Sequence, residues 1–200
     1  MTLLALLRHG PTEWNVARRL QGRADVPLAD AARDELRQRR IPGEFAPFQA
    51  LSSPLSRCRE TAALLGLASR PDSRLIEMDW GRYQGHSVAD LRARLGVDFS
   101  RDETRGLDFC PPGGESPRAV QSRMAPLLAE IAAGRTPTLA ITHRGVIRAI
   151  YAQAVGWSMT ADAPHRLDLY ALQLFRLGSD GTPALERLNV ALEPRLPETP

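Results

Sequence analysis

Apolar residues fall in short runs that alternate with longer amphipathic segments along this chain. Residues 3–7 are apolar at every position, as expected of a strand buried on both faces of a parallel sheet. Residues 50–52 and 138–142 are predicted to be further short buried strands. From Ser116 onward, apolar residues recur along one helical face, and Ser116-Pro117 is typical of a helix start. The pattern predicts an α/β fold.

The remaining segments predict further helices and an edge to the sheet. Helices are expected at 14–20, at 28–40, at 144–155 and in a segment capped by Ser53 with Pro54 at its first position. Residues 169–177 and 184–190 are predicted to be two strands joined by a turn at 179–181, most simply an antiparallel edge. Residues 77–112 suggest one helix around 88–95 and otherwise lack periodic runs, which favours a lid over a site.

Length bounds the number of domains. A chain of 200 residues is large enough for one domain with a substantial core and leaves little room for a second. We expect that domain at residues 1–192. Residues 193–200 contain three prolines and are predicted to be a disordered tail.

Composition narrows the classes of function. The net charge is +3, and all 26 basic residues are arginine, so mechanisms built on a lysine are excluded. Aromatic residues make up 6% of the chain and do not interleave with basic ones, so we expect no nucleic-acid partner. A mildly basic surface instead favours small anionic ligands.

The cysteines and the apolar runs indicate where the protein is located and whether it binds a metal. Cys58 and Cys110 are too few for a disulfide framework or a zinc site, and Cys58 is expected in the core. The first apolar run, at 3–7, is too short for a signal peptide or a membrane span. We therefore expect a cytoplasmic protein with no membrane partner, no metal and no organic cofactor; the sequence predicts no particular oligomeric state.

Two of the predicted strands are each followed directly by a histidine. His9 follows the run 3–7, and His143 follows 138–142. Because ligands of open α/β sheets bind at the carboxyl ends of the strands, the two histidines are expected to meet there. Arg8 adds a planar fork suited to phosphate oxygens. The arrangement predicts a phosphate site with a nucleophilic histidine.

Five motifs follow one another along the chain. They are Arg8-His9-Gly10 with Thr12, Trp14 and Asn15; Ser53-Pro54-Leu55-Ser56-Arg57 with Thr61-Ala62; Leu75 to Gly81; Pro112-Gly113-Gly114-Glu115-Ser116; and Ile141-Thr142-His143-Arg144-Gly145. Together they resemble the histidine phosphatase superfamily, which includes the phosphoglycerate mutases, and the resemblance spans most of the chain. It implies a three-layer α/β/α fold with a mostly parallel sheet and an antiparallel edge.

The resemblance also implies roles for individual residues. His9 would be the nucleophile, and Glu77 the proton donor. Arg8, Arg57 and His143 would hold the phosphoryl group. Further contacts to phosphate are expected from Asn15, Thr12, Gly22 and Thr142.

Two of these roles have a second candidate residue: the arginine that binds phosphate and the proton donor. Arg57 and Arg59 lie about 200° apart around a helix, so only one of them faces a pocket, and helical geometry alone does not choose. Asp79 competes with Glu77, because an alternating strand places both on one face. Motif register favours Arg57 and Glu77.

The predicted activity is hydrolysis of a small phosphorylated metabolite without a metal, through a phosphohistidine on His9. Departures from the mutase pattern at Arg23, Ala32 and Gln84 leave the choice of substrate open. The interval from Glu77 to Gly113 is shorter than in mutases, which favours the phosphatase branch, as in α-ribazole phosphatases, fructose-2,6-bisphosphatase-like members or broad-specificity members. The alternatives are a phosphoglycerate mutase-type phosphotransferase, a metal-dependent hydrolase and a non-catalytic phosphate-binding module.

Overall fold

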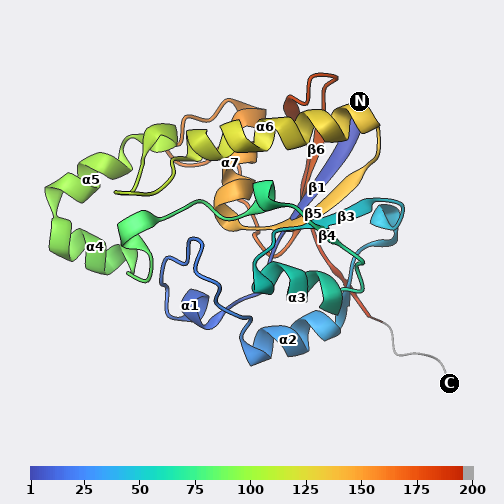
Figure 1. The fold of residues 1–200 in the computed structure, drawn as a ribbon, viewed down its shortest axis with the longest axis horizontal. Coiled ribbons are helices and arrows are strands. Elements are labelled where there is room, and N and C mark those ends of the chain that lie inside the picture. Colours follow the sequence, from blue (N-terminus) through green and yellow to red (C-terminus); the bar gives the residue numbers. More distant parts are fainter. Residues whose placement is uncertain (196–200) are drawn as a thin grey trace.

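A six-stranded sheet forms the centre of the computed structural model, which describes residues 1–195 (Figure 1). Its strand order is β4-β3-β5-β1-β6-β7. The strands are β1 (Thr2–Arg8), β3 (Gln49–Ser52), β4 (Arg70–Pro71), β5 (Thr138–Thr142), β6 (Leu172–Leu177) and β7 (Pro183–Val190). The first four are parallel, and β6 and β7 add an antiparallel edge. This confirms the mostly parallel sheet with an antiparallel edge.

Helices cover both faces of the sheet, which confirms the three-layer architecture (Figure 1). One side carries α6 (Pro117–Gly134) and α7 (Arg144–Val155), and the other carries α2 (Asp30–Arg37) and α3 (Ser56–Leu64). The remaining helices are α1 (Glu13–Val16), α4 (Val88–Leu95), α5 (Val97–Glu103) and four short 3-10 turns at Gly43–Phe45, Ser73–Leu75, Gly81–Tyr83 and Gly106–Asp108.

The alternation of side chains along β1 divides the core in two. Leu4 and Leu6 belong to the apolar cluster under α6 and α7, whereas Ala5 and Leu7 belong to the cluster under α2 and α3. Successive side chains of a strand point to opposite faces, so a strand covered on both sides must be apolar throughout. The unbroken apolar run at 3–7 has this cause.

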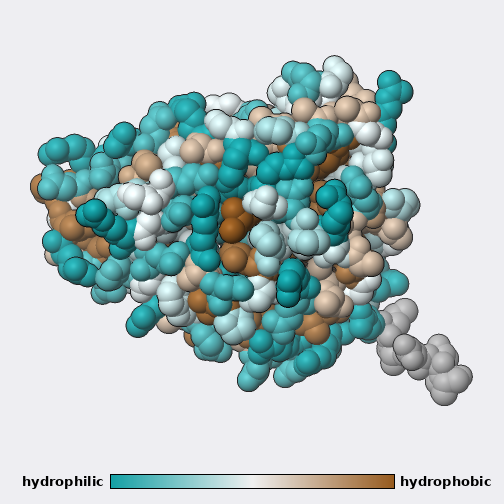
Figure 2. Space-filling model, in the orientation of Figure 1, coloured by the Kyte–Doolittle hydropathy of each residue, from teal (hydrophilic) through white to brown (hydrophobic). Residues whose placement is uncertain are grey.

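The segment predicted to be a lid projects from the body as α4 and α5, seen at the left of Figure 1. A reciprocal capping box between Ser87 and Asp90 starts α4, and Gly96, with φ of 56°, separates the two helices. Leu95 and Val97 are exposed at this elbow. Figure 2 shows apolar surface at the same end of a face that is otherwise largely hydrophilic.

Several predicted boundaries were wrong. The helix expected at 14–20 is only α1, and the one expected at 28–40 ends at Arg37, after which Arg39–Arg40 form β2. The helix α3 begins at Ser56 rather than after Ser53, because the Asp25 carboxylate accepts hydrogen bonds from the Ser56 backbone N–H (2.8 Å) and hydroxyl (2.7 Å) and so supplies its cap.

Two residues expected in a disordered tail are part of a strand. Glu193–Pro194 form the strand β8, which pairs with β2, and Arg40 makes an ion pair with Glu193 at 2.7 Å. The prediction of disorder was therefore wrong at these two residues; 196–200 lie outside the described residues. Among residues 1–195, no helix is both long and apolar enough to cross a membrane.

Candidate active site

Two histidines meet at the carboxyl ends of the central strands, as predicted. Because β1 and β5 are parallel neighbours with Arg8 opposite Thr142, the residues that follow them emerge side by side. The His9 backbone N–H donates to the Thr142 carbonyl at 3.0 Å. The rings of His9 and His143 pack edge to face with their centroids 5.2 Å apart.

The His9 ring is neutral and oriented. Its Nδ1 lies 2.6 Å from the Gly10 carbonyl oxygen, which can only accept, so Nδ1 bears the proton and Nε2 keeps its lone pair. Burial, and after it the charges of Arg8 and Arg57, lower the pKa of His9 well below its usual value. The electrostatics therefore preserve a nucleophilic nitrogen at neutral pH.

Arg57 is fully buried and fixed by several acceptors. It donates to the Ala24 carbonyl at 2.7 Å and to the Gly22 carbonyl at 2.9 Å, and its Nε donates to His9 Nε2 at 3.3 Å. Arg59 is exposed on the opposite side of α3. The structure thus places Arg57, and not Arg59, beside the histidine.

His143 contacts Arg57 and Ser53. Its Nδ1 lies 3.3 Å from Arg57 Nη2, which can only donate, so the ring proton is on Nε2 and is donated to Ser53 Oγ at 2.7 Å. Burial lowers the pKa of His143 well below its usual value. His143 does not line the cavity, so its contact with phosphate stays a prediction. Ser53 was predicted to cap a helix, and its bond to His143 was not predicted.

Glu77 reaches the cavity, whereas Asp79 does not. Glu77 Oε1 accepts hydrogen bonds from the backbone N–H groups of Met78 (2.8 Å) and Gly145 (3.0 Å). Burial raises the pKa of the Glu77 carboxyl, outweighing these bonds, which lower it. Asp79 instead accepts from Gly81 N at 2.8 Å and lies 3.6 Å from Arg23. A buried carboxyl with a raised pKa suits a proton donor.

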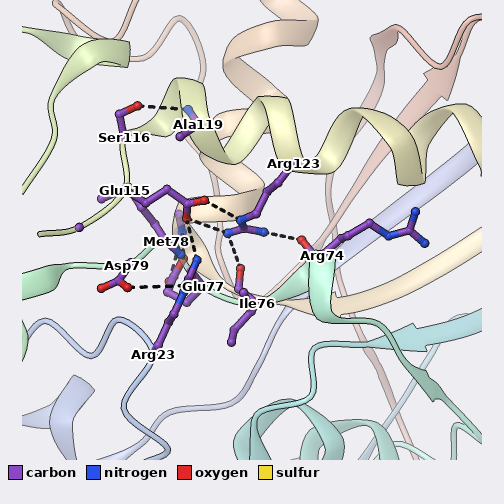
Figure 3. Close-up of polar contacts among 12 residues, drawn as sticks. Arg23, Arg74, Ile76, Glu77, Met78, Asp79, Glu115, Ser116, Ala119 and Arg123 are labelled. Atoms are coloured by element: carbon purple, nitrogen blue, oxygen red, sulfur yellow. Dashed lines mark hydrogen bonds and ion pairs between the residues drawn. The ribbon is translucent and has the colours of Figure 1, made fainter.

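The backbone that presents Glu77 is held by two arginines (Figure 3). Arg123 donates to Glu115 at 2.8 Å and to the Arg74 and Ile76 carbonyls. Arg23 donates to the Glu77 carbonyl at 3.4 Å and pairs with Glu115. This cluster explains the position of Glu115 in its motif, although the sequence did not single out Arg123.

The other predicted residues divide between the cavity and its supports. Arg8, Asn15 and Gly22 line the cavity. The Thr12 hydroxyl is buried against Asn15 Oδ1 at 3.2 Å, and the Thr142 hydroxyl donates to the Leu75 carbonyl at 2.8 Å. Neither threonine lines the cavity, so their expected contact with phosphate stays a prediction, and the contacts seen here position α1 and the segment before Glu77.

The cavity has a volume of about 360 Å³ and is larger than a phosphate ion requires. Both basic and apolar side chains line it. Lining residues that the sequence did not identify include Arg19, Gln21, Trp80, Phe99, Phe109, Arg144, Arg148 and Met159. They come from the segment after α1, the lid, α7 and the loop after α7, and their approach depends on tertiary packing. Over the described part of the chain, no three His, Cys, Asp or Glu side chains gather as a metal would require.

An α/β sheet that places a neutral histidine beside two arginines and a buried carboxyl is typical of proteins that act on phosphate groups. Residues 4–191 match the histidine phosphatase superfamily (branch 1), and the chain belongs to this family.

Similar proteins include both mutases and phosphatases. A 2,3-bisphosphoglycerate-dependent phosphoglycerate mutase of Azorhizobium caulinodans is 32% identical over 92% of this chain and 97% of its own length. A glucosyl-3-phosphoglycerate phosphatase of Mycobacterium tuberculosis is 34% identical over 74% of this chain and 73% of its own. The structure of mycobacterial glucosyl-3-phosphoglycerate phosphatase with VO3 superposes with a TM-score of 0.79 at 26% identity, over 96% of this chain and all of that one.

Proposed function

We propose that this protein hydrolyses a small phosphomonoester through a phosphohistidine on His9, without a metal. The observation that supports this most strongly is the His9 ring itself, whose Nδ1 proton is held by the Gly10 carbonyl while Nε2 lies beside the Arg57 guanidinium. A neutral imidazole fixed in this tautomer, next to groups that bind phosphate oxygens, is prepared for in-line attack on phosphorus.

In the first step, His9 Nε2 attacks the phosphorus atom and the bond to the ester oxygen breaks. Arg57 Nε exchanges its bond to Nε2 for one to a phosphate oxygen, and Arg8 holds another. Glu77 gives its proton to the departing alcohol. The buried Nε of Arg8 has no protein partner within residues 1–195, which suits a group reserved for an anion.

In the second step, water attacks the phosphorus atom of the phosphohistidine. The Glu77 carboxylate takes a proton from that water, the P–N bond breaks and the electron pair returns to Nε2. Inorganic phosphate leaves, and both His9 and Glu77 regain their starting protonation states.

Mutase activity is the second candidate, because a relative that is 32% identical over nearly the whole chain is named a phosphoglycerate mutase. The phosphatases among the relatives and the short interval between Glu77 and Gly113 favour hydrolysis. The two activities differ in the fate of the phosphoryl group, which goes to water in one case and to a second substrate hydroxyl in the other.

The test is a screen of phosphorylated metabolites for phosphate release, with wild type and His9→Ala in parallel and a chelator present throughout. We expect release by the wild type and none by the variant. Exchange between 3- and 2-phosphoglycerate with little phosphate release identifies a mutase instead. Activity that disappears with the chelator and returns with a divalent metal contradicts the metal-free mechanism.

A further inference from the structure

The cavity contains more positive charge than transfer of one phosphoryl group requires. Five arginines but only two glutamates line it. One of the glutamates, Glu103, is paired at 2.7 Å with Arg92, which does not line the cavity. In the span 1–195, none of the five arginines forms an ion pair. The proposed mechanism uses Arg8 and Arg57, so three cationic side chains remain unassigned.

Two of these three lie where the alcohol part of a substrate must be. The leaving oxygen has to lie beside the Glu77 carboxyl, which sits on the Gly145 backbone N–H in the first turn of α7. Arg144 immediately precedes Gly145, and Arg148 follows one helical turn after Arg144 on the same side of the helix. A group attached to the leaving oxygen would therefore share the cavity with these two arginines, which line it together with Glu77.

Arg148 is held in place although its charge and that of Arg144 repel each other. Arg148 lies over the Trp157 ring, with Cζ 4.8 Å from the ring centroid. Burial, together with the charge of Arg144, lowers the pKa of Arg148. Like charges one turn apart are unfavourable, and so is burial of an unpaired charge. An anion placed between the two side chains would remove both penalties.

Taking the proposed hydrolysis as given, we propose that Arg144 and Arg148 form a second anion subsite, and that the substrate is a phosphomonoester whose alcohol part bears a carboxylate or a second phosphate. Trp80 and Phe109, which also line the cavity, offer such a group no charge partner. The subsite would thus select among phosphomonoesters by charge.

Binding of non-hydrolysable phosphonates tests the subsite without turnover. Calorimetry compares 3-phosphonopropionate with propylphosphonate, which has a methyl group in place of the carboxylate, and ethane-1,2-diphosphonate represents a second phosphate. We expect a carboxylate or second phosphonate to tighten binding about tenfold over the methyl compound. Whichever of the two charged compounds binds more tightly identifies the anion.

Variants assign the preference to its residues. Arg148→Gln and Arg144→Gln are each expected to lose most of the preference, whereas Arg148→Lys retains part of it because the charge remains. Arg59→Gln, an exposed arginine outside the cavity, is the matched control and should keep it in full. Because Arg144 is exposed, its variant is expected to fold even if Arg148→Gln does not. A preference that is absent in the wild type, or that survives in Arg144→Gln and Arg148→Gln, overturns the subsite.

Steady-state kinetics separates failure of the subsite from failure of the proposed function. With esters matched in the same way, the ratio of kcat/KM for the charged over the neutral ester should fall about tenfold in Arg144→Gln. Turnover without any charge preference refutes the subsite and leaves hydrolysis standing. If no ester is turned over, hydrolysis is refuted, and the calorimetric comparison still decides the subsite.

Discussion

Replacing Glu77 with Gln isolates proton donation from binding. The amide oxygen of Gln can still accept the hydrogen bonds that Glu77 Oε1 receives from the Met78 and Gly145 N–H groups, so the local backbone should be retained. What is lost is the proton for the leaving alcohol. General acid catalysis contributes about 10²- to 10⁴-fold in rate, equivalent to about 3–5 kcal/mol of barrier. We expect a loss in this range for alkyl phosphates.

The identity of the leaving group provides the internal control. p-Nitrophenolate departs without a proton, so Glu77→Gln should slow the first step with p-nitrophenyl phosphate by less than about tenfold. The assay is single-turnover release of the alcohol from an alkyl ester and from the p-nitrophenyl ester. Asp79→Asn is the matched variant, because Asp79 contacts Arg23 and Gly81 and does not line the cavity.

The same substitution has a predicted effect on stability with a definite sign. Burial raises the pKa of Glu77 in the folded chain above its unfolded value, so the folded state holds this proton more tightly. Stability is therefore lost as pH rises through the folded pKa, and Gln removes that loss. Glu77→Gln should unfold at a higher temperature than the wild type at pH 8. Equal losses on both esters, or a large loss in Asp79→Asn, would refute the assignment of the acid.

Three further predictions follow from the geometry. The lowered pKa of His9 keeps the ring neutral, so a pH–rate profile of kcat/KM should show no loss on the acid side near pH 6. The same profile should fall at higher pH, because Glu77 then ionises and cannot donate its proton. Gly145→Ala would place a methyl group against the Glu77 carboxylate and should cost about tenfold or more in kcat with alkyl esters, in the same assay; unchanged kcat would contradict this placement of the acid. Burial raises the pKa of the Cys58 thiol, so a thiol reagent should label Cys110 alone in the native protein and both cysteines after unfolding; labelling of native Cys58 would contradict its burial.

The sequence was informative wherever local pattern and function coincide. The buried strands place His9 and His143 at adjacent strand ends, and parallel pairing then requires that they meet. Motif register also favoured Arg57 over Arg59. The spacing of the two residues within α3 could not decide between them, because it does not show which side of the helix packs on the sheet.

What the sequence did not predict depends on contacts between distant residues. Ser53 resembles a helix cap, but Asp25 supplies that cap and leaves the Ser53 hydroxyl to His143, 90 positions away. Arg123 fixes the backbone before Glu77 across 47 positions. Such partners are brought together by the packing of helices and loops on the sheet, which local propensity does not predict.

The most direct test of the central claim is to look for the phosphoryl group on His9. The protein is mixed with p-nitrophenyl phosphate and quenched in alkali, where phosphohistidine survives, and its peptides are examined by mass spectrometry. Glu77→Gln serves as the trap, because the second step needs the carboxylate to accept a proton from water. We expect one phosphoryl group on the peptide that contains His9, and none in His9→Ala. Full turnover by His9→Ala, or a phosphoryl group on another residue, would contradict the account.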